Sequence, residues 1–316
     1  MQILAVAAAA AVAALVKFRA GSLLPSLGEL GHPRAGWLAV AVAAELASLA
    51  AYALVVRELL RAGDVVARVS HLLRTTVAGI AMSASLPGGQ VASAAYWYRR
   101  LRHEGASRGL SAYAMVGSMV AGVVSLAALF VAGVAAAGGA GPVASARTPI
   151  LAGCAALVVI VVAVRSRAVR AGTALVRRLA PEVPDRYAVG PSRAALVGAL
   201  AVGNWVLDCA CLAAALAAVH ADVSLRSILL AYTLSQLVGA LPVLPGGGGT
   251  VEASLILTFA AFGQTSASVV AGVLLFRLIS CWGLVPVGWA AVILEGRALV
   301  PLGGRRRAVP SSALAG

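Results

Sequence analysis

Charged residues are scarce in this chain. They make up 11% of the 316 residues, whereas hydrophobic residues make up 61% and the mean hydropathy is +0.95. About a quarter of the residues in a soluble domain are charged. This composition excludes a soluble enzyme or a secreted disulfide scaffold. The long apolar runs predict an all-α, polytopic bundle of transmembrane helices.

Aromatic residues, cysteines and catalytic motifs are also few. Aromatics make up 5% of the chain, and the apolar content is mostly Ala, Val and Leu, which is typical of close helix packing in lipid. The four cysteines lie inside apolar runs without the further Cys or His pair of a zinc site. No His-Glu-x-x-His, Gly-x-Ser-x-Gly or Gly-Lys-Ser motif occurs. We therefore expect no catalytic residues, no enzymatic activity, no metal and no other cofactor.

Acidic residues are outnumbered, and the formal net charge is +14. Lys17 is the only lysine, so nearly all of the positive charge comes from arginine. The arginines lie between apolar stretches and are not gathered in one soluble region, as a nucleic-acid-binding face requires. They are therefore interpreted as determinants of membrane topology, and no nucleic-acid partner is expected.

Eight apolar stretches follow one another along 1–316, which is expected to form one integral membrane domain. They lie near 2–16, 35–56, 75–98, 111–138, 149–164, 194–219, 227–263 and 267–294. One crossing needs about 20 residues, so 227–263 is too long for a single span. The stretch 2–16 is short but is expected to be a first span, with an N-terminus that could be incomplete.

The distribution of basic residues favours a re-entrant segment. If 75–98 enters the bilayer and returns to the same side, nineteen of the Lys and Arg residues lie on that side and five on the other. The positive-inside rule then predicts a cytoplasmic loop at 165–193 and a short cytoplasmic C-terminal tail at 295–316. A plasma (inner) membrane location is expected.

An internal repeat is suggested by the sequence Leu-Pro-Gly-Gly, which occurs at 86–89 and at 244–247. The same offset of 158 residues, without a gap, pairs Asp64 with Asp222 and Gly105 with Gly263. It predicts pseudo-repeats at about 64–107 and 222–265, with coincidence of composition as the alternative. Three expected spans between the copies would give them opposite orientations, as in the inverted-topology repeats of transporters.

Both copies contain a break that should interrupt a helix within the membrane, because proline removes a helical N–H and glycine adds freedom. Helices restarting near Gln90 and Thr250 would direct their positive ends into a cavity, where phosphate or carboxylate can bind. Tight turns that serve only packing are the alternative. The candidate substrate-binding residues at the breaks are Pro87, Gly88, Gly89, Gln90, Pro245, Gly246, Gly247, Gly248 and Gly249.

These motifs resemble a known family. The stretch Leu244-Pro-Gly-Gly-Gly-Gly-Thr-Val-Glu252-Ala, with Phe262-Gly263 after it, resembles the Pro-Gly-Gly-x-Gly-x-x-Glu signature of the flippase-like lysylphosphatidylglycerol synthase transmembrane family. Leu86-Pro-Gly-Gly, followed by Tyr98-Arg-Arg, resembles its first half. The resemblance implies an integral inner-membrane protein linked to the movement of lipid between leaflets.

The chain departs from this family in two respects. Some members carry a cytosolic domain that aminoacylates phosphatidylglycerol, whereas this chain ends at Gly316 without one, and no such activity is expected. In the second motif, glycine occupies the position after the first two glycines, where the family usually places a larger apolar residue.

Four ionisable residues lie inside apolar stretches, where such groups are costly and usually functional. Glu45, Asp208, Glu252 and Arg277 are therefore added to the substrate-binding candidates, and Glu252 occupies the acidic position of the family signature. Arg277 is its expected counter-ion or a phosphate ligand. A structural ion pair is the alternative for each of them. Residues 57–74, with four arginines, are interpreted as an amphipathic surface helix that could gather anionic lipid, with plain orientation signalling as the alternative.

The sequence thus predicts a lipid flippase that moves a phospholipid or lipid-linked headgroup between leaflets, with an anionic membrane phospholipid as its partner. One alternative is a secondary transporter of a small anionic solute. Another is a non-catalytic membrane partner of a separate lipid-modifying enzyme.

Overall fold

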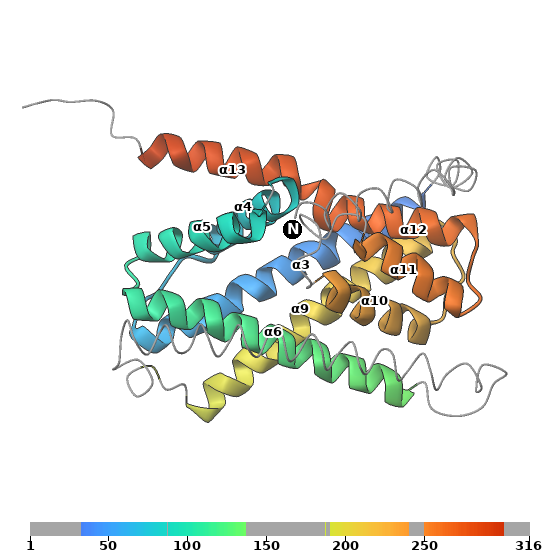
Figure 1. The fold of residues 1–316 in the computed structure, drawn as a ribbon, viewed down its shortest axis with the longest axis horizontal. Coiled ribbons are helices and arrows are strands. Elements are labelled where there is room, and N and C mark those ends of the chain that lie inside the picture. The colour runs from blue at the N-terminus through green and yellow to red at the C-terminus, as the bar shows by residue number, and fades with distance from the viewer. Residues whose placement is uncertain (1–32, 87, 137–186, 188–189, 240–249, 300–316) are drawn as a thin grey trace, which may run out of the picture.

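The computed structural model describes residues 33–86, 88–136, 187, 190–239 and 250–299. Within these ranges the chain forms helices and turns and contains no strand, which confirms the all-α class (Figure 1). Among the described residues, four helical stretches are long and apolar enough to cross a membrane. They are Ala35–Gly63, Arg108–Val134, Pro191–Ala218 and Ala267–Leu294. The expected segments 2–16 and 149–164 lie outside the described residues.

The helices follow one another in two series with the same order. The first consists of α3 (Ala35–Leu60), the 3₁₀ turn η1 (Arg61–Gly63), α4 (Val69–Ser85), α5 (Gly89–His103) and α6 (Arg108–Ala136). The second consists of α9 (Pro191–Ala218), α10 (Leu225–Gly239), α11 (Thr250–Ala261), α12 (Ala267–Arg277), the π-helix η3 (Leu278–Trp282) and α13 (Leu284–Leu299). Each series has a long helix, a pair of short helices, and then another apolar helix.

The short helices α4 and α5 form an antiparallel hairpin. His71, near the start of α4, contacts Glu104, at the end of α5, with 2.9 Å between Nδ1 and Oε1. At the turn, Gly88 caps α5 with a φ of 68°, and a side chain on Gly89 would collide with the Met82 carbonyl. Glycine is therefore required twice at the break. Both ends of the hairpin lie at the same end of the bundle, but its re-entry into a bilayer stays a prediction.

The two series are capped in the same way. Asp64 and His220 are the non-glycine residues with positive φ, at 60° and 59°, within the described part of the chain. Gly105 and Gly263 likewise end α5 and α11 with φ of 91° and 77°. The glycine pair is the one expected from the sequence offset of 158, but the gap-free pairing of Asp64 with Asp222 is wrong. The left-handed residue that follows α9 is His220, not Asp222. In this part of the two series, the structures therefore match with a shift of two residues from the offset of 158.

The first helix of each series packs against the other in an antiparallel direction. The Arg34 N–H, at the start of α3, donates to the Ala218 carbonyl at the end of α9 over 2.9 Å. Midway along both helices, Asn204 Nδ2 donates to Ser48 Oγ over 2.7 Å, and Ser48 Oγ lies 3.0 Å from the Asn204 carbonyl. Figure 1 shows α3 and α9 side by side through the middle of the bundle. The inverted membrane orientation of the two series stays a prediction.

The last apolar stretch, 267–294, is one helical path with a change of winding. After Arg277 it forms η3, and the Gly283 N–H donates to the Leu278 carbonyl five residues earlier, over 2.7 Å. Pro286 explains this wider helical turn, because in a regular α-helix its ring would clash with the carbonyl of Trp282, four residues earlier. Helix α13 then reaches Leu299, so the C-terminal tail begins later than the predicted residue 295.

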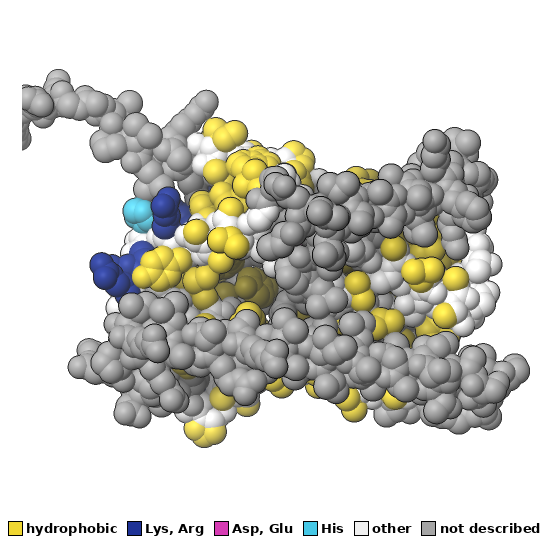
Figure 2. Space-filling model, viewed as in Figure 1, with side chains coloured by type: hydrophobic (Ala, Val, Ile, Leu, Met, Phe, Trp, Pro, Cys, Tyr) yellow, Lys and Arg dark blue, Asp and Glu magenta, His cyan; other side chains and the backbone are white. Residues whose placement is uncertain are grey.

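Residues 57–74 are not one surface helix, contrary to the sequence interpretation. They include the end of α3, the η1 turn, a non-helical segment and the start of α4. The chain turns there because Asp64 adopts the left-handed conformation. Basic side chains do gather where α5 ends, and Figure 2 shows Lys or Arg side chains and a histidine at the left of the view, next to hydrophobic side chains.

Candidate functional site

A cavity of about 310 Å³ lies where the two series meet. Its walls come from α3, α4, α9, α10, α12 and η3, and it is partly open to the outside of the bundle. The polar and charged residues that line it are Glu45, Ser48, Tyr52, Thr76, Ser83, Asn204, Asp208, Gln236, Arg277 and Ser280. In a bundle of apolar helices, such a concentration of polar groups marks a candidate site for a polar ligand.

Helical periodicity explains why these residues converge. In α3, Glu45, Ser48 and Tyr52 lie at positions i, i+3 and i+7, which share one face of a helix. The same spacing places Asn204 and Asp208 on one face of α9, four residues apart. The walls formed by α3 and α9 are therefore polar stripes on otherwise apolar helices.

Arg277 and Glu252 form a buried ion pair. Arg277 Nε, at the end of α12, donates to Glu252 Oε1, in the first turn of α11, over 2.6 Å. Both side chains are 9% exposed. Burial of two charges is costly unless they are paired and hydrogen-bonded. The pair predicted from the sequence is therefore formed, and it holds α11 against α12.

Asp208 is held by the hydroxyl and amide of α10. Tyr232 Oη donates to Asp208 Oδ2 over 2.6 Å, and Gln236 Nε2 donates to the same oxygen over 3.1 Å. Glu45 of α3 lies within interaction range of Asp208, and both lie within range of the Arg277 charge. Three of the four ionisable candidates thus line the cavity itself, and Glu252 contacts it through Arg277.

Several polar atoms of the cavity residues make no hydrogen bond with the described part of the chain. They are Glu45 Oε2, Asp208 Oδ1, Arg277 Nη2 and Ser280 Oγ, and all four are buried. Buried polar groups in folded proteins nearly always have partners, so a cluster of exceptions requires an explanation. Here the exceptions share one cavity, where water, a proton or a ligand group can satisfy them.

The candidates at the helix breaks are placed differently. Gly88, Gly89 and Gln90 do not line the cavity, and Gln90 is exposed. Pro87 and Pro245, Gly246, Gly247, Gly248 and Gly249 lie outside the described residues. The helices do restart where expected, at Gly89 and Thr250. Because Glu252 lies in the first turn of α11, a carboxylate of the chain already faces the positive end of that helix.

Comparison with known proteins identifies the family. The sequence profile described as "Lysylphosphatidylglycerol synthase TM region" matches residues 2–288. The chain belongs to this family. It is a multi-pass integral membrane protein.

Two relatives are membrane proteins of Methanothermobacter thermautotrophicus strain Delta H, both named "UPF0104 membrane protein". One is 32% identical over 88 residues, which cover 28% of this chain and 26% of the relative. The other is 30% identical over 89 residues, covering 28% of this chain and 27% of the relative. The matched part is thus about a quarter of each relative's length.

In this member of the family, sequence reasoning missed part of the cavity. The candidates from the sequence did not include Thr76, Asn204, Gln236 and Ser280, which line the cavity, or Tyr232, which donates to Asp208. The signal was the helical spacing of polar residues, such as Tyr232 and Gln236 at i and i+4. No three His, Cys, Asp or Glu side chains gather as a metal site would require, within the residues that the structure describes.

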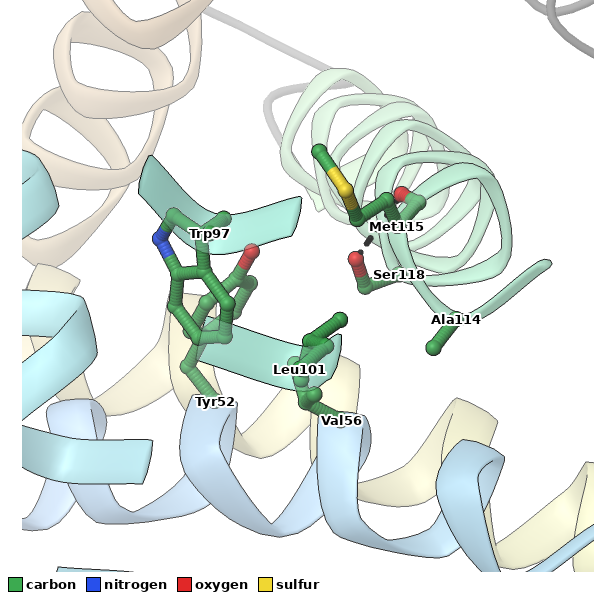
Figure 3. Close-up of a pocket in the computed structure, with 7 residues that line it drawn as sticks. All are labelled: Tyr52, Val56, Trp97, Leu101, Ala114, Met115 and Ser118. Carbon is green, nitrogen blue, oxygen red and sulfur yellow. Dashed lines mark hydrogen bonds between the residues drawn. The ribbon is translucent and has the colours of Figure 1, made fainter. Parts of the chain in front are cut away.

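A second, smaller pocket of about 90 Å³ lies in the first series. Figure 3 shows Tyr52 of α3 and Trp97 of α5 on one side, with Met115 and Ser118 of α6 opposite them. The Tyr52 and Trp97 rings meet edge to face with centroids 6.0 Å apart. Ser118 Oγ donates to the Met115 carbonyl of its own helix over 3.0 Å. This pocket contains no charged side chain among its lining residues.

Proposed function

We propose that this protein is a lipid flippase, which moves the polar headgroup of a phospholipid through the central cavity from one leaflet to the other. The observation that carries the proposal is the cavity lined by Glu45, Asp208 and Arg277 between apolar helices. A polar headgroup cannot cross the hydrocarbon region unaided, because its hydrogen bonds to water must be replaced. The family relationship supports a role in lipid biology.

The size of the cavity supports a headgroup as the cargo. Its volume of about 310 Å³ is at the lower end of the range of about 300–1,000 Å³ that is common for ligand pockets. A whole phospholipid is too large for it, so the acyl chains would remain in the lipid while the headgroup passes between the helices. The partial opening of the cavity to the outside of the bundle is suited to such a path.

The charges favour a headgroup that combines phosphate with a cationic group. Arg277 has a buried Nη2 without a hydrogen bond to the described residues, and guanidinium groups bind phosphate oxygens well. Glu45 and Asp208 would repel a purely anionic headgroup but attract an ammonium group. The anionic phospholipid expected from the sequence is therefore a poorer fit than a phospholipid that also carries positive charge.

The proposed role needs no chemical step by the chain itself. We therefore also propose that it is not an enzyme, and that a separate lipid-modifying enzyme can supply its cargo. No cofactor is required for the passage of a headgroup.

The experiment that tests this function uses the purified protein in liposomes with lipids that are fluorescently labelled on an acyl chain. Flipping of phosphatidylethanolamine, detected by loss of fluorescence to an impermeant quencher, should exceed that of phosphatidylglycerol. Arg277→Gln should abolish it, whereas Gln90→Ala, outside the cavity, should not. Uptake of a soluble anion without flipping of either lipid would favour the secondary transporter instead.

We propose that the protein resides in the plasma membrane with its C-terminus in the cytoplasm. Single cysteines at Arg61 and Arg102, introduced into a cysteine-free background, test the orientation together with a third at Arg177. All three should resist an impermeant thiol reagent in intact cells and react after permeabilisation. Arg61 and Arg102 belong to segments at the same end of the bundle. Labelling of one but not the other in intact cells would contradict the re-entrant hairpin.

A further inference from the structure

Two carboxyl groups from opposite series meet in the central cavity. Glu45 comes from α3 and Asp208 from α9, and the two side chains are close enough for their carboxyl groups to interact. Glu45 is only 5% exposed, so it is more than nine-tenths buried. Two ionised carboxylates this close in a poorly solvated site would repel each other strongly. The contact therefore needs a positive charge or a proton.

Each carboxyl group of the pair has an oxygen atom that makes no hydrogen bond with the described residues. Asp208 Oδ2 accepts from Tyr232 and Gln236, over 2.6 and 3.1 Å. Asp208 Oδ1 and Glu45 Oε2 are buried and make no hydrogen bond with the described residues. Ionised carboxylates can only accept hydrogen bonds, whereas a protonated one also donates. One proton is the smallest group that turns this contact of two acceptors into a hydrogen bond.

The surrounding elements do not neutralise the pair. Arg277 of α12 is the one basic side chain in the described cavity wall, and it is engaged by Glu252 of α11. Helix α10 presents Tyr232 and Gln236, and α4 presents the hydroxyls of Thr76 and Ser83. The remaining titratable neighbours are uncharged when protonated: Tyr52 of α3, the thiols of Cys209 and Cys211 on α9, and the thiol of Cys281 on η3. One arginine thus faces three carboxyl groups.

We propose that Glu45 and Asp208 form a proton-binding site that holds one proton between their carboxyl groups and exchanges it with water when a headgroup enters or leaves the cavity. On binding, a hydronium ion transfers its proton to one carboxylate oxygen and becomes water, and the new O–H group donates a hydrogen bond to the other carboxylate. On release, the proton returns to water and the pair becomes doubly negative, which attracts a cationic headgroup. Binding of the proton is independent of the proposed flippase function, whereas its coupling to transport rests on that function.

The binding is tested on the purified full-length chain in nanodiscs by infrared spectroscopy, which detects the carbonyl stretch of a protonated carboxyl group. At neutral pH the wild type should show this band and should lose it as the pH is raised. Glu45→Gln and Asp208→Asn should each lack it. Glu58→Gln is the matched control, because Glu58 is a buried acid of the same helix that is paired with Arg61 over 2.6 Å, outside the cavity.

Three outcomes would overturn the proton site. They are absence of the band from the wild type, its persistence in both cavity variants, or its loss at constant pH when sodium replaces a bulky organic cation. The last result would assign the site to a metal cation. Because the wild-type titration needs no variant, a folding defect in Glu45→Gln or Asp208→Asn does not prevent a decision.

The coupling is tested separately in liposomes with a pH difference across the membrane. The flipping rate should depend on the direction of the pH difference, and Glu45→Gln should lose this dependence while Glu58→Gln retains it. If the infrared band titrates but no lipid is flipped, the flippase function fails and the proton site stands. If lipid is flipped at the same rate under either pH difference, the coupling fails and the flippase function stands.

Discussion

The two series place different residues at matching positions. Tyr52 and Asp208 each lie seventeen residues after the start of their helix, and Ser118 and Arg277 each lie ten residues after the start of theirs. In the first series these positions border a small uncharged pocket. In the second series they carry a carboxylate and a guanidinium.

Packing differs between the series in the same way. The backbone carbonyls of Leu101 and Phe259 each accept a hydrogen bond that closes the end of a helix, where the next turn contains a glycine in the left-handed conformation. The two residues therefore occupy matching positions. Leu101 borders the pocket of the first series, whereas Phe259 is fully buried in a core with Leu212, Leu255 and Val273. Similar backbones therefore need not give two equivalent sites. Of the three charged residues that line the central cavity, Asp208 and Arg277 belong to the second series and Glu45 to the first.

Removal of Arg277 should have the largest effect, because it breaks the buried ion pair with Glu252. Arg277→Gln is expected to lower the free energy of unfolding by about 3–5 kcal/mol and to abolish lipid flipping. Unfolding by sodium dodecyl sulfate in mixed micelles measures the first effect, and the liposome assay measures the second.

The double variant Glu252→Gln with Arg277→Gln separates the structural role of the pair from its transport role. It should recover most of the lost stability without recovering transport. Ser118→Ala, at the position that matches Arg277, is the control and should lower stability by no more than about 1 kcal/mol, because it loses one hydrogen bond to its own helix. Normal transport by the double variant would remove the ion pair from the site.

Deletion of a leucine side chain should be costlier in the second series than in the first. Leu255 and Leu101 are both 0% exposed, but Leu101 borders the small pocket, whereas Leu255 belongs to the core with Leu212, Phe259 and Val273. Leu→Ala in a core costs about 2–5 kcal/mol, depending on how far the surroundings can relax. Leu255→Ala should lie near the upper end of this range and Leu101→Ala near the lower end, measured by the same unfolding titration. Equal losses would contradict the difference in packing.

Filling the small pocket should have the smallest effect, and its sign should be favourable. Ala114 borders the pocket, and Val273 occupies the matching position in the second series. Ala114→Val should raise stability by about 0.5–1 kcal/mol, within the usual range for cavity filling.

Ala271→Val, in the filled core of the second series, is the control for overpacking and should lower stability by about 1–3 kcal/mol. Thermal unfolding in detergent measures both variants. A loss of stability in Ala114→Val would show that the pocket of the first series cannot accept even a valine.

The membrane class, the helix breaks and the buried ionisable residues could all be predicted from the sequence. Each depends on local or compositional information: the scarcity of charge, the turn residues near Gly88, and the placement of a charge such as Glu252 inside an apolar run. The offset of 158 residues also located one matching glycine pair. The offset did not predict the counterpart of Asp64, because the left-handed residue after a helix can shift by two positions while the helices before and after it remain similar.

Which face of each helix is polar follows from the sequence alone, because a helix repeats every 3.6 residues regardless of its neighbours. Tertiary packing brings the faces of Glu45, Asp208 and Gln236 together in one cavity, and it pairs Glu252 with Arg277 beside that cavity. These contacts depend on where antiparallel helices cross, at Ser48 and Asn204, and on the angle at which they do so. Side-chain packing between distant segments sets that crossing, and no local pattern encodes it.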